Sequence, residues 1–287
     1  MIPFMSHEMP NEISELLSRI SNLETHIANL EMNVIPLSQD QRSRLVATVG
    51  LLQPKIPSGD LVRVGGEADG GYVIETPMLG STVLSLGVGT EISADLHLIE
   101  SYECEVHAFD PYVERPINAP MKFMFSQIGL GRNEIKAGLK FQTIDQILST
   151  LPTKPNLALI DIEGSELTLI DSFHYLRDVE QIVIEFHDLD QIIFEEFFLK
   201  FTALLKQILK SHEPIHIHGN NDGPTLRIQG AIWPSIIEVS FRKKSSMSAK
   251  EFNFGPWPHQ LDRPNNPARP DLYLEPFFGK SANYRPF

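Results

Sequence analysis

The sequence predicts a Rossmann-like α/β domain built on a mostly parallel sheet. Three observations indicate this class. Short apolar runs of strand length alternate with helical patterns, as in βαβ units. The apolar run that begins at Thr82 leads into Gly87 and Gly89 and then into a helical pattern. The run 156–162 is apolar without alternation, as expected for a parallel strand that is covered on both faces.

The chain has 287 residues, which is enough for one large domain with extensions at both ends. We expect an N-terminal amphipathic helix over residues 1–36, the α/β domain over 37–242 and a strap over 243–287. The last part is rich in proline, which excludes a long helix, and its aromatic residues argue against full disorder. We therefore expect an extended strap that packs on the domain or on a partner subunit.

Apolar residues near the start of the chain recur in alternating steps of three and four. The positions are Ile13, Leu16, Ile20, Leu23, Ile27, Leu30 and Val34. Ile or Val at heptad position a with Leu at d favours two parallel helices, and Pro36 ends the pattern. We expect this helix to join two copies into a homodimer. The alternative is a helix folded back on its own domain.

A strand, a glycine turn and a helix follow one another from Thr82, and they predict a ligand site. Gly87 and Gly89 allow backbone amides to approach a ligand, although a plain tight turn explains them as well. The next strand ends in Asp110, about twenty residues on, where such folds place a carboxylate for ribose hydroxyls. Ile92 stands where a dinucleotide-binding turn has its third glycine. Since S-adenosylmethionine has no pyrophosphate, the pattern favours this cofactor over NAD without excluding NAD.

Two further segments extend the predicted site. The third apolar run ends at Gln127 and Ile128, where the adenine of a cofactor on the carboxyl edge would lie, although a structural role fits equally well. Upstream, the turn 69–72 contains Asp-Gly-Gly and precedes a strand. This turn is either an ordinary hairpin signal or a cover over the cofactor.

Two successive buried strands end in acidic and imidazole groups. Asp161 and Glu163 mark the end of the first, and His187 and Asp188 mark the end of the second. Open α/β sheets bind ligands at the carboxyl ends of their strands, so we expect these groups to face a ligand. The alternatives are that the carboxylates cap a helix beginning near Gly164 and that His187 is a structural histidine.

The last part of the domain predicts a helix and two final strands. In the first strand His216 and His218 alternate with apolar residues and Asn220 follows, so a half-buried polar face explains the histidines nearly as well as substrate binding. We expect the strand at 236–241 to pair with it antiparallel. The helix 192–209 precedes both strands. Its predicted core stripe consists of Phe194, Phe197, Phe198, Phe201, Leu204, Leu205 and Ile208.

Several of these motifs resemble those of the FkbM-type methyltransferases, a group of class I S-adenosylmethionine-dependent enzymes. The matching pieces between Leu61 and Ser240 are LSLGVG, HAFDP, TIDQIL, and above all ALIDIEGSE followed by VIEFHD; GGEADGGYVI and HIHGNN resemble a branch of related proteins. The resemblance implies a class I methyltransferase fold and methylation, usually of an oxygen, on sugars or natural products. The family usually has an acidic residue before Gly-x-Gly, whereas this chain has Ser85 and Leu86.

Methyl transfer to an alcohol gains from a general base, because alcohols are poorly ionised near neutrality. His187 is the first candidate, because an ordinary imidazole titrates in the useful range, and Asp161 is the second. Asp161 is alternatively a ligand for the methionine amino group or, with Asp188, for a divalent metal, which is possible but not predicted. The expected cofactor-binding residues are Asp69, Gly71, Tyr72, Gly87, Gly89, Asp110, Gln127, Ile128 and Asp161. The expected substrate-binding residues are Glu163, Asp188, His218 and Asn220.

The composition excludes several classes of function. No apolar run approaches the roughly 18 residues that a membrane helix needs, so we expect no membrane span. A formal net charge of −13 repels a phosphate backbone, which argues against nucleic acid. The single cysteine, Cys104, is expected in the core. The first residues lack the basic start and apolar stretch of a secretion signal, so we expect a cytoplasmic location.

Three functions fit this sequence. The first is an S-adenosylmethionine-dependent methyltransferase acting on a small molecule or glycan. The second is an NAD-dependent oxidoreductase on a similar sheet, which Asp110 favours and Ile92 disfavours. The third is a noncatalytic scaffold that keeps the fold and dimerises through the N-terminal helix.

Overall fold

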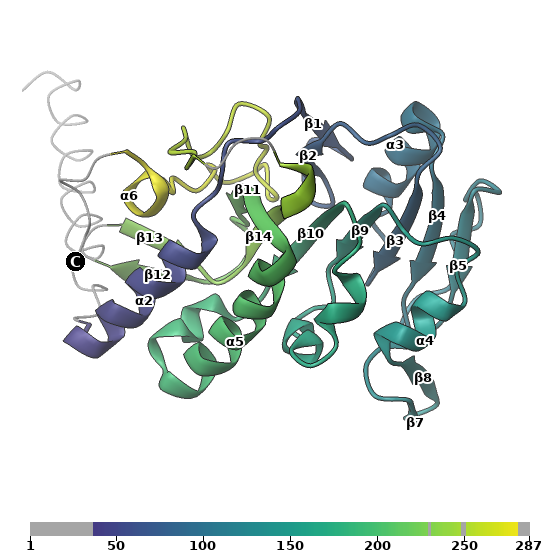
Figure 1. The fold of residues 1–287 in the computed structure, drawn as a ribbon, viewed down its shortest axis with the longest axis horizontal. Coiled ribbons are helices and arrows are strands. Elements are labelled where there is room, and N and C mark those ends of the chain that lie inside the picture. Colours follow the sequence, from purple (N-terminus) through teal and green to yellow (C-terminus); the bar gives the residue numbers. More distant parts are fainter. Residues whose placement is uncertain (1–36, 229–230, 248–250, 281–287) are drawn as a thin grey trace, which may run out of the picture.

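The computed structural model describes residues 37–228, 231–247 and 251–280. The predicted N-terminal helix, and with it the predicted dimer contact, lies outside these residues. The described chain has three layers, with a central sheet between two layers of helices and connecting segments (Figure 1). The predicted Rossmann-like α/β fold is confirmed. Of the helices in the described ranges, none is long and apolar enough to pass through a lipid bilayer.

The central sheet has seven strands. Their order is β11 (His212–Gly219), β14 (Ile237–Lys243), β10 (Gln181–Phe186), β9 (Leu157–Ile160), β3 (Thr82–Leu86), β4 (Glu105–Phe109) and β5 (Phe123–Ser126). Strand β14 is antiparallel to both of its neighbours, as predicted for the last strands, and the other pairs are parallel. The chain runs from β3 outward to β5 and then returns to β9 on the other side of β3. The boundary between β3 and β9 is therefore the switch point at which such sheets bind ligands.

Two hydrophobic cores lie on opposite faces of the sheet, because successive side chains of a strand point to opposite sides. Leu84 and Leu86 belong to one core, whereas Val83 belongs to the other. The first core is covered by α2 (Gln39–Leu52), α4 (Ile144–Ser149) and α5 (Glu195–Ser211). The second is covered by α3 (Ser93–Tyr102) and by the antiparallel pair β1 (Leu61–Val64) and β2 (Tyr72–Glu75). Cys104 is buried in the second core, as predicted.

Shorter elements connect these layers. They are the strands β6 (Gly129–Leu130), β7 (Glu134–Lys136), β8 (Leu139–Gln142), β12 (Thr225–Ile228) and β13 (Ala231–Pro234), the 3-10 helices η1 (Glu166–Leu169), η2 (Phe173–Leu176), η3 (Leu189–Ile193) and η4 (Lys244–Ser246), and the helix α6 (Glu275–Phe278). In chain order, η1 is the next element after β9 and η3 is the next element after β10. The chain that leaves the carboxyl ends of β9 and β10 therefore continues in each case into a short 3-10 helix.

The predicted helix at 192–209 is shifted in the structure, and this changes one part of its predicted stripe. Phe201 and Ile208 are buried as expected. Phe194 was expected in the core but is 59% exposed. It is the N-cap of α5, because the five residues before it form the separate helix η3 and α5 begins at Glu195. The apolar pattern in the sequence therefore begins about one turn before the N-terminus of the α-helix, within η3.

The described part of the strap packs on the α/β domain (yellow in Figure 1). Trp257 and Phe278 are 1% and 0% exposed, and both belong to the core that α2 and α5 cover. The backbone N–H of Asn253 donates to the carbonyl of Pro54 at 2.8 Å. The strap is thereby joined to the segment after α2, in which the backbone N–H of Lys55 donates to the carbonyl of Pro214 in β11 at 2.7 Å.

Candidate functional site

Gly87, Asp110 and Asp161 lie together at the carboxyl ends of β3, β4 and β9. The backbone N–H of Asp161 donates to the carbonyl of Leu86 at 2.9 Å, and that of Gly89 donates to Oδ2 of Asp110 at 2.9 Å. Gly87 has a φ of +77°, and a Cβ there would collide with the carbonyl oxygen of Asp161. Glycine is therefore required where this turn passes the end of β9.

A cavity of about 240 Å³ opens beside these strand ends. It is lined by Asp69, Gly70, Tyr72, Ser85, Leu86, Gly87, Val88, Gly89, Thr90, Glu91, Ala94, Asp95, Leu159, Asp161 and Glu163. Five of these lining residues carry a carboxyl group, and none of the lining residues within the described ranges is Lys, Arg or His. A concave site with charges of one sign concentrates ligands of the opposite charge. The cavity therefore favours a cationic group.

His187 lies next to this cavity because β10, which it follows, is the parallel neighbour of β9. Its Nε2 lies 3.4 Å from Oε2 of Glu163, 3.8 Å from Oδ1 of Asp161 and 3.9 Å from Oε1 of Glu185. Its Nδ1 lies 3.1 Å from Oε1 of Glu166. The structure thus brings together the two side chains, His187 and Asp161, that the sequence suggests for catalysis.

Glu166 holds the imidazole of His187 at its Nδ1 atom. It is 3% exposed, begins η1 and accepts the backbone N–H of Gly164 at 3.1 Å. An ionised carboxylate accepts hydrogen bonds, so Nδ1 of a neutral His187 carries the proton and donates it to Glu166. The other nitrogen, Nε2, then presents its lone pair toward Asp161 and Glu163.

The carboxyl groups around His187 change the pKa values of the site. Burial lowers the pKa of His187, but its hydrogen bond and ion pair with Glu166 and the charges of Asp161 and Glu163 outweigh this, so the pKa lies above its ordinary 6.5. Burial raises the pKa of Asp161 to about 7, against the opposing charge of His187. Both pKa values are therefore raised by the surroundings of the site, and such shifts are common for groups that transfer protons.

Tyr72 and Glu185 complete the polar surroundings. Burial raises the pKa of Tyr72 well above 10, and the charges of Asp161 and Glu185 add to this, so its hydroxyl stays protonated and can donate. Burial, and then the charge of Asp161, raises the pKa of Glu185 well above its usual value. Asn220, a predicted substrate ligand, is 5% exposed and donates Nδ2 to Oε1 of Glu185 at 3.1 Å.

Three of these residues have the arrangement of a possible metal site. One ligand atom each from Asp161, Glu163 and His187 lie within 4.8 Å of one another. Carboxylate oxygen and imidazole nitrogen are suitable ligands for several divalent metals. Asp188, the other metal ligand suggested by the sequence, is exposed and does not belong to this group.

Four of the predicted cofactor residues do not line the cavity, namely Gly71, Asp110, Gln127 and Ile128. Asp110 is 5% exposed, and its Oδ1 accepts the backbone N–H of Tyr112 at 2.7 Å. Gln127 is exposed and Ile128 packs against the core, and neither lines the cavity. A Cβ at Gly71 would collide with the side chain of Arg63, whereas the neighbours of Gly71 on both sides line the cavity.

His218, predicted to face substrate, is 2% exposed and lies under the strap. Its Nδ1 lies 3.2 Å from Oε2 of Glu238, and its Nε2 lies 3.0 Å from Oδ1 of Asp271. His216 is also buried, with Nε2 3.0 Å from Oδ1 of Asp262. The strand face that the sequence suggests to be half-buried is thus fully covered, and residues of the strap supply the covering carboxylates.

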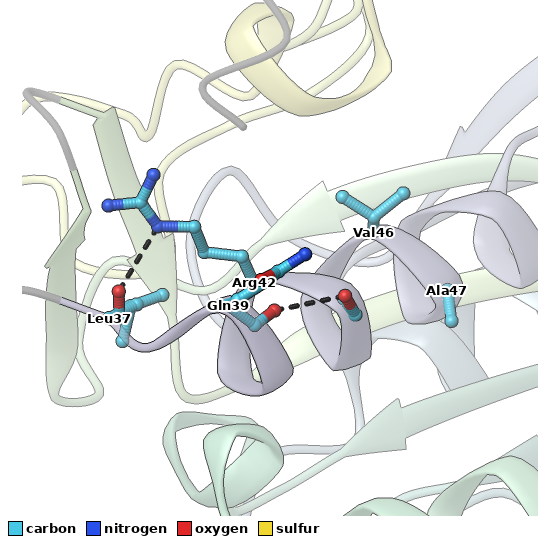
Figure 2. A pocket seen from close by; sticks show the side chains of 6 residues that line it. Leu37, Gln39, Arg42, Val46 and Ala47 are labelled. Carbon is cyan, nitrogen blue, oxygen red and sulfur yellow. Dashed lines mark hydrogen bonds between the residues drawn. The ribbon is translucent and has the colours of Figure 1, made fainter.

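A larger hollow, of about 660 Å³, lies along α2 (Figure 2). Its described lining residues are Leu37, Gln39, Arg42, Ser43, Val46 and Ala47. They come from one short segment, in which Nε of Arg42 donates to the carbonyl of Leu37 at 3.1 Å. They include no carboxyl or imidazole group and no residue from the carboxyl ends of the sheet. The described lining of this hollow therefore lacks the carboxyl groups found at the cavity of the switch point.

The sequence assigned no role to several residues that the structure places at the site. Glu166 is the last residue of the Asp-x-Glu-Gly-x-Glu motif, so the sequence contained a signal for it. Its contact with His187 depends on the fold and could not be recognised from that motif. Asp95 lies in a helical pattern, and its place in the cavity follows from how α3 packs on β3. Asn265 has no recognisable motif, and it reaches Asp69 through the path of the strap.

Comparisons with known proteins add the following. No protein-family model and no curated protein matches the chain. Among solved structures, it is similar to a chain of a fibrillarin/Nop5p complex, with 12% identity over 57% of this chain and 73% of that chain and a TM-score of 0.37. It is similar to methyltransferase FkbM from Methylobacillus flagellatus KT, with 17% identity over 56% of this chain and 43% of that chain and a TM-score of 0.34.

A third solved structure is a predicted O-methyltransferase from Agrobacterium tumefaciens, with 10% identity over 63% of this chain and 88% of that chain and a TM-score of 0.37. Structures named as methyltransferases thus occur among those that the chain is similar to. At these identities and scores the similarity shows neither a family nor a substrate. The α/β fold rests on the order and direction of the strands, and a fold of this kind hosts many functions.

Proposed function

We propose that this protein is an S-adenosylmethionine-dependent methyltransferase. The observation that carries this proposal is the cavity at the switch point, whose described lining has five carboxyl groups and no basic side chain. S-adenosylmethionine contains a sulfonium and an ammonium group, which suit such a cavity. The pyrophosphate of NAD is anionic and would be repelled there, so the same observation disfavours an oxidoreductase.

The residues around the cavity suit the other parts of this cofactor. Asp110 lies at the end of β4, where Rossmann-like sheets hold ribose hydroxyls. The turn at Gly87 and Gly89 leads from β3 toward α3 and lines the cavity, and its own N–H groups donate to the carbonyl of Phe109 and to Oδ2 of Asp110. Asp69, in the connection between β1 and β2, and Tyr72, the first residue of β2, border the cavity. We propose these residues, with Asp161, as the main cofactor-binding set.

We propose further that the acceptor is a hydroxyl group on a sugar, a glycan or another natural product. When bound, the cofactor supplies an electrophilic methyl group. His187 is the proposed general base, because its Nε2 faces the same carboxyl groups that border the cavity. Asp161 and Glu163 lie beside Nε2 and would accept hydrogen bonds from neighbouring hydroxyl groups of the acceptor, which would orient the reacting hydroxyl toward Nε2. Nε2 would take the hydroxyl proton, the methyl carbon would pass from the sulfonium sulfur to the acceptor oxygen with release of S-adenosylhomocysteine, and Glu166 would stabilise the resulting imidazolium.

Binding of S-adenosylhomocysteine, measured by isothermal titration calorimetry, tests the cofactor. We expect the wild-type protein to bind S-adenosylhomocysteine. We expect it not to bind NADH, whose binding is measured by the fluorescence of the nicotinamide ring. Folded protein that fails to bind S-adenosylhomocysteine would refute the proposal, and saturable NADH binding would favour the oxidoreductase. A panel of hydroxyl, amine and thiol acceptors with isotopically labelled S-adenosylmethionine then tests the acceptor class. A protein that binds the cofactor and methylates nothing would favour the scaffold.

We also propose that two copies of the chain form a homodimer through the heptad pattern of residues 13–34. Ile at a and Leu at d are the residues that carry this proposal. Light scattering should give twice the mass of one chain, and charged substitutions at Leu16 and Leu23 together should give the mass of one. A monomeric wild-type protein at micromolar concentration would contradict this.

A further inference from the structure

Asp95 has the properties of an incomplete binding site. It lies in the first turn of α3, is 3% exposed and lines the cavity at the switch point. Its Oδ1 is buried without a hydrogen-bond partner among the described residues. Most buried polar atoms in proteins have a partner, because an unpartnered one destabilises the folded protein. A ligand in this cavity that carries a hydrogen-bond donor would satisfy this oxygen.

The charges that face this cavity determine which donor fits. Burial raises the pKa of Asp95 to about 7; the Ser85 hydroxyl and the residue's own backbone amide oppose this, and the charge of Glu91 adds to it. The other carboxyl groups of the lining belong to Asp69, Asp161 and Glu163. A cationic donor would both bond to Oδ1 and offset these charges, whereas a neutral hydroxyl would do only the first.

The position of the cavity indicates which part of the cofactor fills it. Its lining comes from β3, the turn after it, α3, the end of β9 and the start of β2 with the segment before it, and it includes no residue of β4 or β5. Asp110, the proposed ribose ligand, lies on the β4 side of Gly89. A volume of about 240 Å³ is below the roughly 300 to 1,000 Å³ of typical ligand pockets. The cavity therefore suits the amino-acid half of the cofactor, with the adenosine half outside it.

We infer that the carboxylate of Asp95 binds the primary ammonium group in the amino-acid half of the cofactor. This inference rests on the proposed function, since it takes S-adenosylmethionine as the ligand. An ammonium group at Oδ1 stabilises the ionised carboxyl group. Binding near pH 6.5 therefore releases a proton that the unliganded carboxyl group holds.

Two ligands that differ in the amino-acid half test the inference. S-adenosylhomocysteine carries the ammonium group, and 5′-methylthioadenosine carries the adenosine without it. In calorimetry, Asp95→Asn should lower the affinity for S-adenosylhomocysteine by roughly ten- to a hundredfold, as expected for loss of a charge-assisted hydrogen bond. The affinity for 5′-methylthioadenosine should change by less than about twofold. Glu100→Gln is the matched control, because Glu100 is an exposed carboxylate on the same helix and does not line the cavity.

Proton release gives a second readout. Titrations at pH 6.5 in two buffers of different ionisation enthalpy should show more protons released with S-adenosylhomocysteine than with 5′-methylthioadenosine, and Asp95→Asn should remove this excess. Equal affinity of wild type and Asp95→Asn for S-adenosylhomocysteine would overturn the inference. An equal loss of affinity for both ligands would also overturn the inference, because it would indicate a general effect of the substitution on the cavity. Wild-type protein that binds neither ligand would instead refute the proposed function itself, and the inference with it.

Discussion

Asn265 of the strap donates its side-chain Nδ2 to Oδ1 of Asp69 at 2.9 Å. The same amide donates to Oε1 of Glu238 at 2.7 Å, and the backbone N–H of Asp69 donates to the carbonyl of Asn265 at 3.2 Å. Asn265 therefore connects a residue of the cavity lining with β14, which runs beside β10. The position of Asp69 at the cavity depends on a segment far along the chain.

Replacing Asn265 with alanine tests this connection. Asn265→Ala leaves the buried Glu238 without one donor and frees Asp69 from its side-chain partner, so we expect S-adenosylhomocysteine to bind several-fold more weakly. The unfolding free energy should fall by about 1 to 3 kcal/mol. Calorimetry and urea unfolding measure the two effects. Asn266→Ala is the control, because the Asn266 side chain bonds to Asp222 at an exposed position. Unchanged binding in Asn265→Ala would show that the strap does not position Asp69.

The contact between Glu166 and His187 predicts the pH dependence of methyl transfer. A general base acts in its neutral form, so kcat/KM for the acceptor should rise with pH through the pKa of His187, which lies above 6.5. Glu166→Gln removes the charge and hydrogen bond that raise this pKa, so the inflection should move to lower pH and the maximal rate should fall. Glu196→Gln alters an exposed carboxylate on α5 and should leave the profile unchanged. A profile with the same inflection in Glu166→Gln would exclude the proposed role of Glu166.

The central fold was predictable because local patterns determine it. Unbroken apolar runs identified the buried strands, and the glycine turn marked the start of α3 after β3. The end of β9 and the end of β10 were predictable as neighbours, because successive parallel strands share an edge. This is why His187 and Asp161 could be placed together from the sequence.

The rest of the site depends on contacts that no local pattern encodes. Ser85 stands where the FkbM-type motif usually has an acidic residue, and the structure places the carboxyl group of Asp95 next to Ser85 from the following helix. The burial of His218 follows from the strap, whose Asp271 comes more than fifty residues later in the chain. Alternation of polar and apolar residues shows that a strand has two faces, but it does not show what covers each face.

Removal of divalent metal tests the group formed by Asp161, Glu163 and His187. We propose His187 as a base, which requires a free Nε2, so methyl transfer should persist after treatment with EDTA and dialysis. Added Mg²⁺ or Mn²⁺ should raise the rate by less than about twofold. Loss of activity on chelation, with recovery on addition of one metal, would instead assign these three side chains as metal ligands. Calorimetry of metal binding to Glu163→Gln would then check the ligand set.

His218 predicts how the stability of the folded protein depends on pH. Burial lowers its pKa, but the charge of Glu238 and the hydrogen bond with Asp271 outweigh this, so the folded-state pKa lies well above 6.5. The folded protein thus holds a proton that the unfolded chain loses as the pH rises past about 6.5. The stabilisation is fully present below pH 6.5 and is lost as the pH rises through the folded-state pKa.

Between these two pKa values, His218 contributes a fall in unfolding free energy of up to about 1.4 kcal/mol per pH unit. His218→Gln should remove this slope while leaving the slopes that other groups cause. Urea unfolding of both proteins at several pH values from 6 to 9 measures the difference. His174→Gln is a suitable control, because that imidazole is exposed and bonds to the backbone carbonyl of Asp171. Equal slopes in wild type and His218→Gln would show that His218 is not held in its protonated form between Glu238 and Asp271.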